Sequence, residues 1–571
     1  MKTSTNVLLT LFPGVVAFQP YARQTYHVPG RGRLSPAKHS VWRLQSTIQG
    51  TITRRDQKKI PKRRNDLEFR DGPLNSSTIS SGQIQLPWHI RIAKGMWEEC
   101  VPWMATFFVG LFATLAFHHS APFFLLFLAE FLFCMLSTKK VLQKLNKPML
   151  PEPLINKDWE EVAFKVWASL DDALSRKSYL MGWFYEAPFT ALRQEDALSY
   201  LSWQRYGMPL GTGLATEEEI SDLLKFDLPL LEQNVNGGRP LPQRNPDEDP
   251  LPFMAFNCEP LRYRHKPMLF YAATHGMSYA THQSLTKIGF EYVPAKDPEH
   301  DLSYWSHIPN TSVDNMTDPL VFIHGVGGIA SCYPMIEDLL QSTSDDNTPI
   351  IVIDLPHVSL RWCKDNTPKI RSQVASISKI LDSVSVGSGK ATFVGHSYGT
   401  ALISWMVQSH PEKVKGCVFI DPICFMLHLK KILFNFHLQR VDEKIQSTRK
   451  WDNPFSIGSL INLAGTEMHT NYSMLRQFSW ATNSLWPEDL VNRNIPTSII
   501  MSEVDDIVPV QDVEQLFQRA DSALIDVHVF DNANHGDMLF DEEMRAVTVE
   551  IIRGIARTSH SRRERILESL L

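Results

Sequence analysis

Three side chains that lie far apart in the sequence have the types and the order that acyl-transfer chemistry uses. Ser397 lies within Gly395-His396-Ser397-Tyr398-Gly399, a Gly-x-Ser-x-Gly pattern, and Asp505 and His535 follow it in that order. A serine hydroxyl is a weak nucleophile, so it needs a base to take its proton and an acid to orient that base. The chemistry that this set predicts is nucleophilic attack on a carbonyl carbon.

The elements around Ser397 would expose its hydroxyl. The pattern follows a predicted strand over residues 391–394 and opens a predicted helix over residues 400–409. A serine between strand and helix sits on a sharp turn, where neighbouring backbone leaves no room for a Cβ on the flanking glycines. The helix amino terminus also offers N–H groups to a developing oxyanion. The alternative is a serine-containing turn in a protein without catalytic activity.

The acid and the base follow predicted strands further along the chain. Asp505 comes after the strand 498–501, and His535 lies on a loop after the strand 525–530. Similar short runs rich in Val, Ile and Phe recur through this half of the chain, and segments with helical spacing separate them. Runs this short and apolar are typical of strands covered on both faces, so we predict an α/β fold with a mostly parallel sheet and helices on both faces. The runs are Leu320–Ile323, Ile350–Ile353, Thr392–Val394, Cys417–Ile420, Ser498–Met501 and Ile525–Phe530.

On these motifs, residues from about 266 to 571 resemble the α/β-hydrolase superfamily, which has the chain order Ser, Asp or Glu, His. In that family the acid typically occurs as Asp-x-Ile-Val-Pro, so the resemblance implies Asp505 rather than Asp506. Asp421 is a lesser alternative, because some lipases carry the acid after that strand, whereas Asp421-Pro422 is otherwise a turn. A serine nucleophile also argues against the epoxide hydrolase and haloalkane dehalogenase branches, which use aspartate.

The family also carries His-Gly after its third strand, here His324-Gly325-Val326. By resemblance, the backbone N–H groups of Val326 and Tyr398 form the oxyanion hole. His324 would then hold its loop, and His396 would be structural. The family places a lid between the later strands, here about 423–494, and its apolar residues indicate either a hydrophobic substrate, contact with a bilayer, or simple packing on the core.

The amino-terminal region has the composition of targeting segments. Residues 1–17 read as a signal peptide, and residues 18–97 as a basic, disordered arm of transit-peptide type. The Val16–Pro20 junction resembles the two-part signals of algae with complex plastids. The alternative is an ordinary secretory signal followed by a basic arm. We therefore expect a plastid location or one in the endoplasmic reticulum or secretory pathway.

Residues 98–138 are predicted to attach the protein to a membrane. Between Val101 and Ser137 the only formal charge is Glu130. Two apolar runs, 101–117 and 123–136, are each short for crossing about 30 Å of hydrocarbon, so a helical hairpin is favoured. One tilted span or a buried core helix are the alternatives.

A helical subdomain is predicted for residues 150–265, where charges alternate with apolar residues. Its aromatic stretch 178–185, together with 395–400 and 421–427, resembles a group of membrane-attached α/β-hydrolases in fungi and algae. The alternative for that stretch is ordinary helix packing.

The composition excludes several other classes of protein. The 571 residues are 43% hydrophobic and 21% charged, which argues against global disorder, and the net charge is −5. Positive charge is concentrated in residues 18–71 and the remainder is acidic, so nucleic-acid binding is not expected. Seven scattered cysteines without a CxxC pattern indicate neither a disulfide framework nor a zinc site.

The sequence therefore predicts a membrane-attached serine hydrolase that cleaves a hydrophobic, lipid-like carboxylic ester and needs no metal or organic cofactor. An acyltransferase with the same three residues is the first alternative. A non-catalytic scaffold that kept the fold is the second.

Overall fold

The computed structural model describes most of the chain from residue 121 to residue 557. The exceptions within that range are 156, 211–215, 262, 299, 344–345, 364–366, 385–386 and 439–462. The predicted signal peptide, the basic arm and the first part of the predicted membrane segment, residues 98–120, therefore lie outside the described residues.

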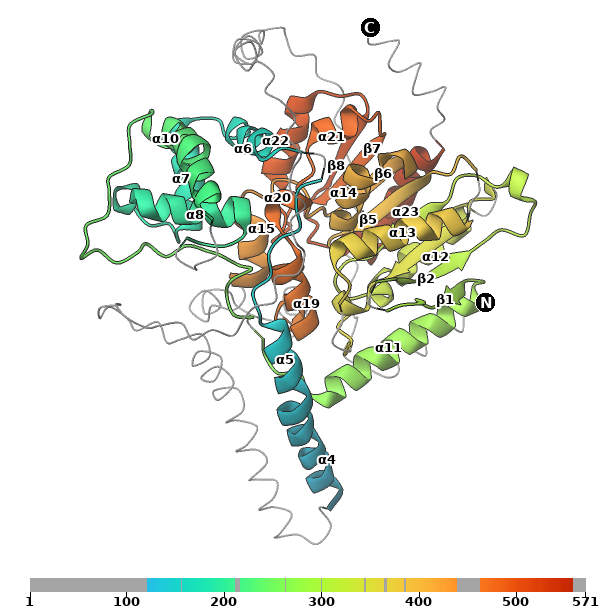
Figure 1. Ribbon diagram of the computed structural model, residues 1–571. Coiled ribbons are helices and arrows are strands. Elements are labelled where there is room, and N and C mark those ends of the chain that lie inside the picture. The colour runs from blue at the N-terminus through green and yellow to red at the C-terminus, as the bar shows by residue number, and fades with distance from the viewer. Residues whose placement is uncertain are drawn as a thin grey trace. The chain divides into compact units, whose positions relative to one another are not determined.

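An eight-stranded sheet has the strand order β1-β2-β4-β3-β5-β6-β7-β8 (Figure 1). The strands are β1 (Glu291–Val293), β2 (Ser303–His307), β3 (Leu320–Ile323), β4 (Ile350–Asp354), β5 (Ala391–His396), β6 (Val414–Ile420), β7 (Thr497–Ser502) and β8 (Ile525–Phe530). The last six strands pair in parallel, whereas β1 and β2 are antiparallel. The prediction of a mostly parallel α/β sheet is confirmed. The two antiparallel strands were not predicted, because they are short and rich in polar residues.

Side chains alternate between the two faces of the sheet, as the two-residue period of a strand requires. In β3, Val321 and Ile323 join one hydrophobic cluster, while Leu320 and Phe322 join the other. The first cluster is completed by α13 (Ile370–Val384), α14 (Gly399–Ser409) and α22 (Val510–Ala520). The second is completed by α12 (Ile329–Thr343) and α23 (Glu542–Ala556). Covering both faces explains why the parallel strands are apolar throughout.

The described residues between β6 and β7 form short helical segments. They are α15 (Lys431–Leu433), η8 (Phe434–Leu438), α19 (Met468–Tyr472), η9 (Ser473–Gln477), α20 (Trp480–Asn483) and α21 (Pro487–Val491). The buried segment directly after β6 contacts the helix that ends at Trp183. The indole Nε1 of Trp183 donates to the carbonyl oxygen of His428 at 3.1 Å.

Over the described part of residues 159–236, α-helices and the turns between them pack around aromatic side chains. They are α6 (Trp159–Ala168), α7 (Ala173–Trp183), α8 (Gln194–Tyr206), α9 (Glu217–Asp222) and α10 (Leu228–Asn236). Trp183 and Trp203 have ring centroids 5.2 Å apart, and Phe256 lies 6.0 Å from Trp183. Residues 179–184 of the predicted aromatic stretch are thus part of the core of this helical region, whereas Tyr185 is exposed.

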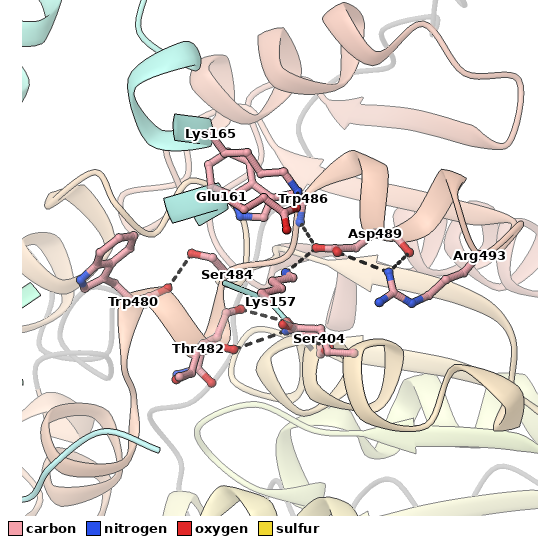
Figure 2. Close-up of polar contacts among 12 residues, drawn as sticks. Lys157, Glu161, Lys165, Ser404, Trp480, Thr482, Ser484, Trp486, Asp489 and Arg493 are labelled. Carbon is pink, nitrogen blue, oxygen red and sulfur yellow. Dashed lines mark hydrogen bonds and ion pairs between the residues drawn. The ribbon is translucent and has the colours of Figure 1, made fainter. Parts of the chain in front are cut away.

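A buried ion pair joins this helical region to the segment before β7 (Figure 2). Lys157 Nζ lies 2.7 Å from Asp489 Oδ2, and their side chains are 4% and 7% exposed. Asp489 also accepts from the backbone amide of Trp486 at 3.0 Å and lies 3.3 Å from Arg493 Nη1. Burial lowers the pKa of Lys157. The charge of Asp489 opposes that shift, so the pair offsets part of the cost of burying Lys157.

A helical rod, α4 (Ala121–Leu132), η1 (Phe133–Thr138) and α5 (Lys139–Leu145), leads into the helical region. Over residues 121–557, apart from the gaps given above, no helix is both long and apolar enough to cross a bilayer. Glu130 has internal partners: its Oε1 lies 2.6 Å from His265 Nε2, and its Oε2 accepts from the amide of Met268 at 2.7 Å. Met268 begins α11 (Met268–Lys287), so this carboxylate complements the positive end of that helix.

Candidate active site

Ser397 lies at the turn between β5 and α14. Its backbone φ is +50°, a left-handed conformation that residues other than glycine rarely adopt. A Cβ on Gly399 would lie 2.1 Å from the carbonyl oxygen of Ile323, and one on Gly395 would lie 2.7 Å from Cδ1 of Ile403. The turn therefore excludes a Cβ at position 399, and a Cβ at position 395 would also lie 3.0 Å from the backbone carbonyl carbon of Gly399. These close approaches explain the Gly-x-Ser-x-Gly pattern.

His535 bridges the serine and the acid. Its Nε2 lies 3.0 Å from Ser397 Oγ, and its Nδ1 lies 2.7 Å from Asp505 Oδ2. With the imidazole neutral and its proton on Nδ1, Ser397 donates to the ring and the ring donates to the carboxylate. The structure thus brings together the three residues predicted as nucleophile, base and acid, and the serine and histidine are each only 7% exposed.

Asp505, rather than Asp506, faces the imidazole. Its other oxygen, Oδ1, accepts from the backbone amides of Ile507 at 2.7 Å and Val508 at 2.9 Å. These two residues are the Ile-Val of the Asp-x-Ile-Val-Pro pattern. The pattern therefore makes a turn whose amides fix the carboxylate in the orientation that His535 needs.

Asp421, the alternative acid, lies beside the three residues in a different role. It is fully buried and accepts hydrogen bonds from the Ser502 amide at 3.0 Å, the Ser502 hydroxyl at 3.2 Å and the Gly536 amide at 2.6 Å. Ser502 ends β7 and Gly536 follows His535. Asp421 therefore connects the loop that bears the acid to the loop that bears the base.

The carboxylates favour the charged imidazole. Burial opposes it, but Asp505, Asp421 and Asp506 together raise the pKa of His535 to about 9. Burial and the charge of Asp505 raise the pKa of Asp421 to about 7. An imidazolium that forms as Ser397 loses its proton is thus stabilised within the site.

The loop after β3 lies directly against the serine. A Cβ on Gly325 would come within 2.8 Å of Ser397 Cβ, so the backbone approaches the nucleophile more closely than a larger residue allows. Within the described ranges, the backbone amides of Val326 and Tyr398 donate to no protein acceptor. Both are thus available to a ligand, as the predicted oxyanion hole would need.

His324 and His396 also lie near the serine, and the two side chains have different contacts. His324 Nδ1 lies 2.7 Å from the carbonyl oxygen of Gly325, and its Nε2 accepts from the amide of Leu355 at 3.0 Å. This side chain ties the loop after β3 to the end of β4. His396 is buried, and burial followed by the charge of His535 lowers its pKa. Its neutral ring lies 5.4 Å from that of His535.

Asp421, Asp505 and His535 also have donor atoms within 4.8 Å of one another, a spacing that a metal ion could use. Each carboxylate already accepts hydrogen bonds, and the histidine nitrogens face Asp505 and Ser397. A cation there would have to displace the contacts that align the serine and its base. The hydrogen-bond pattern therefore fits proton transfer better than metal binding.

Helix α11 lies against the segment that follows β3, a position that the sequence analysis did not predict. Its residues line a cavity together with Gly327 and Gly328, which follow the predicted oxyanion residue Val326. Residues 268–287 contain no motif that carries chemistry. The sequence alone therefore offered no signal that this helix lies beside the site.

Residues 320–551 match the family model described as the alpha/beta hydrolase family. Over 117 residues the chain is 26% identical to a pyrethroid hydrolase of Sphingobium wenxiniae. That alignment covers 18% of this chain and 35% of the pyrethroid hydrolase, so the chain spans about a third of that relative.

Two solved structures illustrate more distant similarity. One is a membrane phospholipase A described as a bacterial virulence factor, with 15% identity, a TM-score of 0.34, and coverage of 51% of this chain and 94% of that one. The other is a carboxylesterase from Bacillus subtilis, with 15% identity, a TM-score of 0.34, and coverage of 49% and 97%. The family match and the strand order together support an α/β-hydrolase fold for residues 320–551.

Proposed function

We propose that this protein, whose residues 320–551 match the α/β-hydrolase family, is a membrane-attached serine hydrolase that cleaves a hydrophobic carboxylic ester. The observation that carries the proposal is the continuous chain of contacts from Ser397 Oγ through His535 to Asp505. The description of the pyrethroid relative as a hydrolase agrees with it.

The reaction would proceed in two acyl transfers. Ser397 Oγ attacks the ester carbonyl carbon as His535 Nε2 takes the hydroxyl proton, and Asp505 stabilises the resulting imidazolium. The amides of Val326 and Tyr398 bind the oxyanion. His535 then gives its proton to the departing alcohol, which leaves an acyl-enzyme. Water, deprotonated by His535, attacks that acyl group and regenerates the serine. No step requires a metal or an organic cofactor.

Membrane attachment is the second part of the proposal. The second apolar run, 123–136, lies in α4 and η1, and its Leu125 and Leu126 are 62% and 54% exposed. The one charge of that run, Glu130, is satisfied by contacts within the protein. An exposed apolar helix face without a charge of its own favours a lipid environment. A lipid-like ester is the substrate class that such a location makes accessible.

An acyltransferase remains the second candidate, and one observation favours it. Ser397 and His535 are each only 7% exposed, so the acyl-enzyme would be shielded from bulk water. An acceptor alcohol that binds at the site could then compete with water for the acyl group. Product analysis in the presence of an added long-chain alcohol distinguishes hydrolysis from transfer.

Labelling with a fluorophosphonate probe tests the proposal directly. We expect the detergent-solubilised protein to be labelled and the Ser397→Ala and His535→Ala variants to be unlabelled. Labelling should be repeated in liposomes, because a buried site can depend on lipid to open. Folded protein that stays unlabelled in both media would refute an activated serine and favour a non-catalytic scaffold.

A further inference from the structure

A cavity lies between α11 and the segment that follows β3. Its volume is about 190 Å³. The apolar part of its lining consists of Phe270, Met277, Ile329, Ala330, Leu360 and Leu463. An apolar cavity of this kind binds apolar ligands in preference to water.

Two residues that line the cavity are neighbours in the sequence of the residue predicted to bind the oxyanion. Gly327 and Gly328 line the cavity, and Val326, the predicted oxyanion residue, comes directly before them. On the other side of Val326, Gly325 lies against Ser397. The segment that lines the cavity therefore continues directly from the residue whose amide is predicted to bind the ester carbonyl oxygen.

The charged wall of the cavity is internally neutralised. Arg361 Nη2 lies 2.5 Å from Asp354 Oδ1, and Arg361 Nη1 donates to Ser278 Oγ at 3.0 Å. Burial lowers the pKa of His282, another lining residue, so its ring is neutral. A site whose one guanidinium is already paired with a carboxylate favours an uncharged ligand over an anion.

We propose that this cavity is the pocket for the acyl chain of the substrate, and that it selects medium-chain esters. The inference rests on the proposed esterase function. An apolar cavity of about 150 Å³ holds benzene, so 190 Å³ accommodates roughly seven carbon atoms. One wall, α11, precedes residue 320 and so lies outside the segment that matches the hydrolase family. This specificity would belong to this chain and not to the family fold.

The amino-terminal end of α11 connects the pocket to an exposed apolar surface. Phe270 lines the cavity, and the preceding residue, Leu269, is 73% exposed. Glu130 of α4 holds this end of the helix through the Met268 amide. The exposed Leu125 and Leu126 lie on the same α4 helix. An acyl chain would thus reach the pocket from the side of the molecule proposed to face lipid.

Substitutions that change the size of the pocket test the proposal. We expect kcat/KM of the wild type, measured on p-nitrophenyl esters of two to sixteen carbons, to be highest near six to eight carbons. Ala330→Phe, which fills the cavity, should lower kcat/KM for the eight-carbon ester at least tenfold and leave the two-carbon ester within about twofold. Phe270→Ala should move the optimum toward longer chains. Tyr279→Ala, at a residue of α11 that is 68% exposed, is the matched control and should keep the wild-type profile.

A binding measurement separates this proposal from the proposed function. Methyl octanoate should bind to Ser397→Ala protein by calorimetry, and the added Ala330→Phe substitution should abolish that binding. Binding of this kind in a protein that hydrolyses no ester would refute the esterase function and retain the pocket. An active enzyme whose chain-length profile is unchanged in both pocket variants would refute the pocket and retain the esterase. A preference for esters that end in a carboxylate would assign the pocket to anion recognition by Arg361 and overturn the acyl-chain proposal.

Discussion

The carboxylate of Asp421 accepts a hydrogen bond from the backbone amide of Gly536 at 2.6 Å, although 115 residues separate the two. Gly536 follows the histidine that contacts Ser397. The same carboxylate binds the amide and hydroxyl of Ser502 at the end of β7, on the loop that leads to Asp505. Asp421 is therefore a positioning residue that sets the distance between the acid-bearing and base-bearing loops.

Replacement of Asp421 by asparagine should reduce catalysis and shift its pH dependence. An amide presents donors where the carboxylate accepts, so we expect kcat/KM to fall about tenfold to a hundredfold with little change in KM. Because the charge of Asp421 raises the pKa of His535, its removal should move the acidic limb of the pH profile to lower pH. Ser502→Ala removes one hydrogen bond without changing the charge and should leave that limb in place. An unshifted limb in Asp421→Asn would contradict the charge effect.

The ionisation of His535 should control activity well above neutral pH. Only the neutral imidazole can take the proton of Ser397, and the pKa of His535 is raised to about 9. We therefore expect log kcat/KM of the free enzyme to rise with pH up to about 9 and then to level off. Circular dichroism at each pH should verify that the protein stays folded. An acidic limb that gives a pKa near the ordinary histidine value of about 6.5 would mean that the carboxylates do not raise the pKa of His535.

The same shift predicts a pH-dependent contribution to stability. A raised folded-state pKa stabilises the fold while the group is charged, so the contribution is complete below about pH 6.5 and is lost as the pH rises through about 9. The difference in free energy of unfolding between wild type and His535→Gln should decline across that window. Urea denaturation at pH 6, 7.5 and 9 measures it, and a difference that grows with pH would have the wrong sign.

Gly325 should be required for activity more than for folding. Alanine at this position places a Cβ 2.8 Å from Ser397 Cβ, which would displace the nucleophile from His535. We expect Gly325→Ala to lower kcat at least a hundredfold and to destabilise the fold by about 1–3 kcal/mol. Gly276→Ala in α11, where a Cβ meets nothing within 4 Å, is the control and should be neutral or stabilising by about 0.5–1 kcal/mol. Thermal denaturation and steady-state kinetics of both variants provide the comparison.

The ion pair between Lys157 and Asp489 should be important for stability. Lys157→Met leaves a buried carboxylate with fewer partners, so the free energy of unfolding should fall by about 3 kcal/mol. Lys165→Met is the control, because the ion pair of Lys165 with Glu161 has side chains that are 22% and 52% exposed. This substitution should lower the free energy of unfolding by less than about 1 kcal/mol. Equal effects of the two substitutions in urea denaturation would show that burial of the pair is unimportant.

Much of the site could be predicted because local chain geometry encodes it. The apolar strands of the parallel sheet are short runs buried on both faces, and the glycines around Ser397 follow from the space that its turn allows. The choice of Asp505 over Asp506 came from the resemblance to the family's Asp-x-Ile-Val-Pro pattern, and the structure shows that the two amides after Asp505 belong to a local turn. The polar strands β1 and β2 lacked such a signal, because pairing at the antiparallel side of the sheet does not require an apolar run.

The strand pattern, the turn at Ser397 and the chain order of serine, acid and histidine could all be predicted without a structure. The strand pattern and the turn depend on residues that are neighbours along the chain, whereas the order of the three side chains is read directly from the sequence. The tertiary structure alone decided that Asp421 joins two loops, that Glu130 holds the start of α11, and that α11 forms a wall beside the loop after β3. These features depend on contacts between residues more than forty positions apart, which no local periodicity records. Packing brings such residues together only when the whole domain has folded.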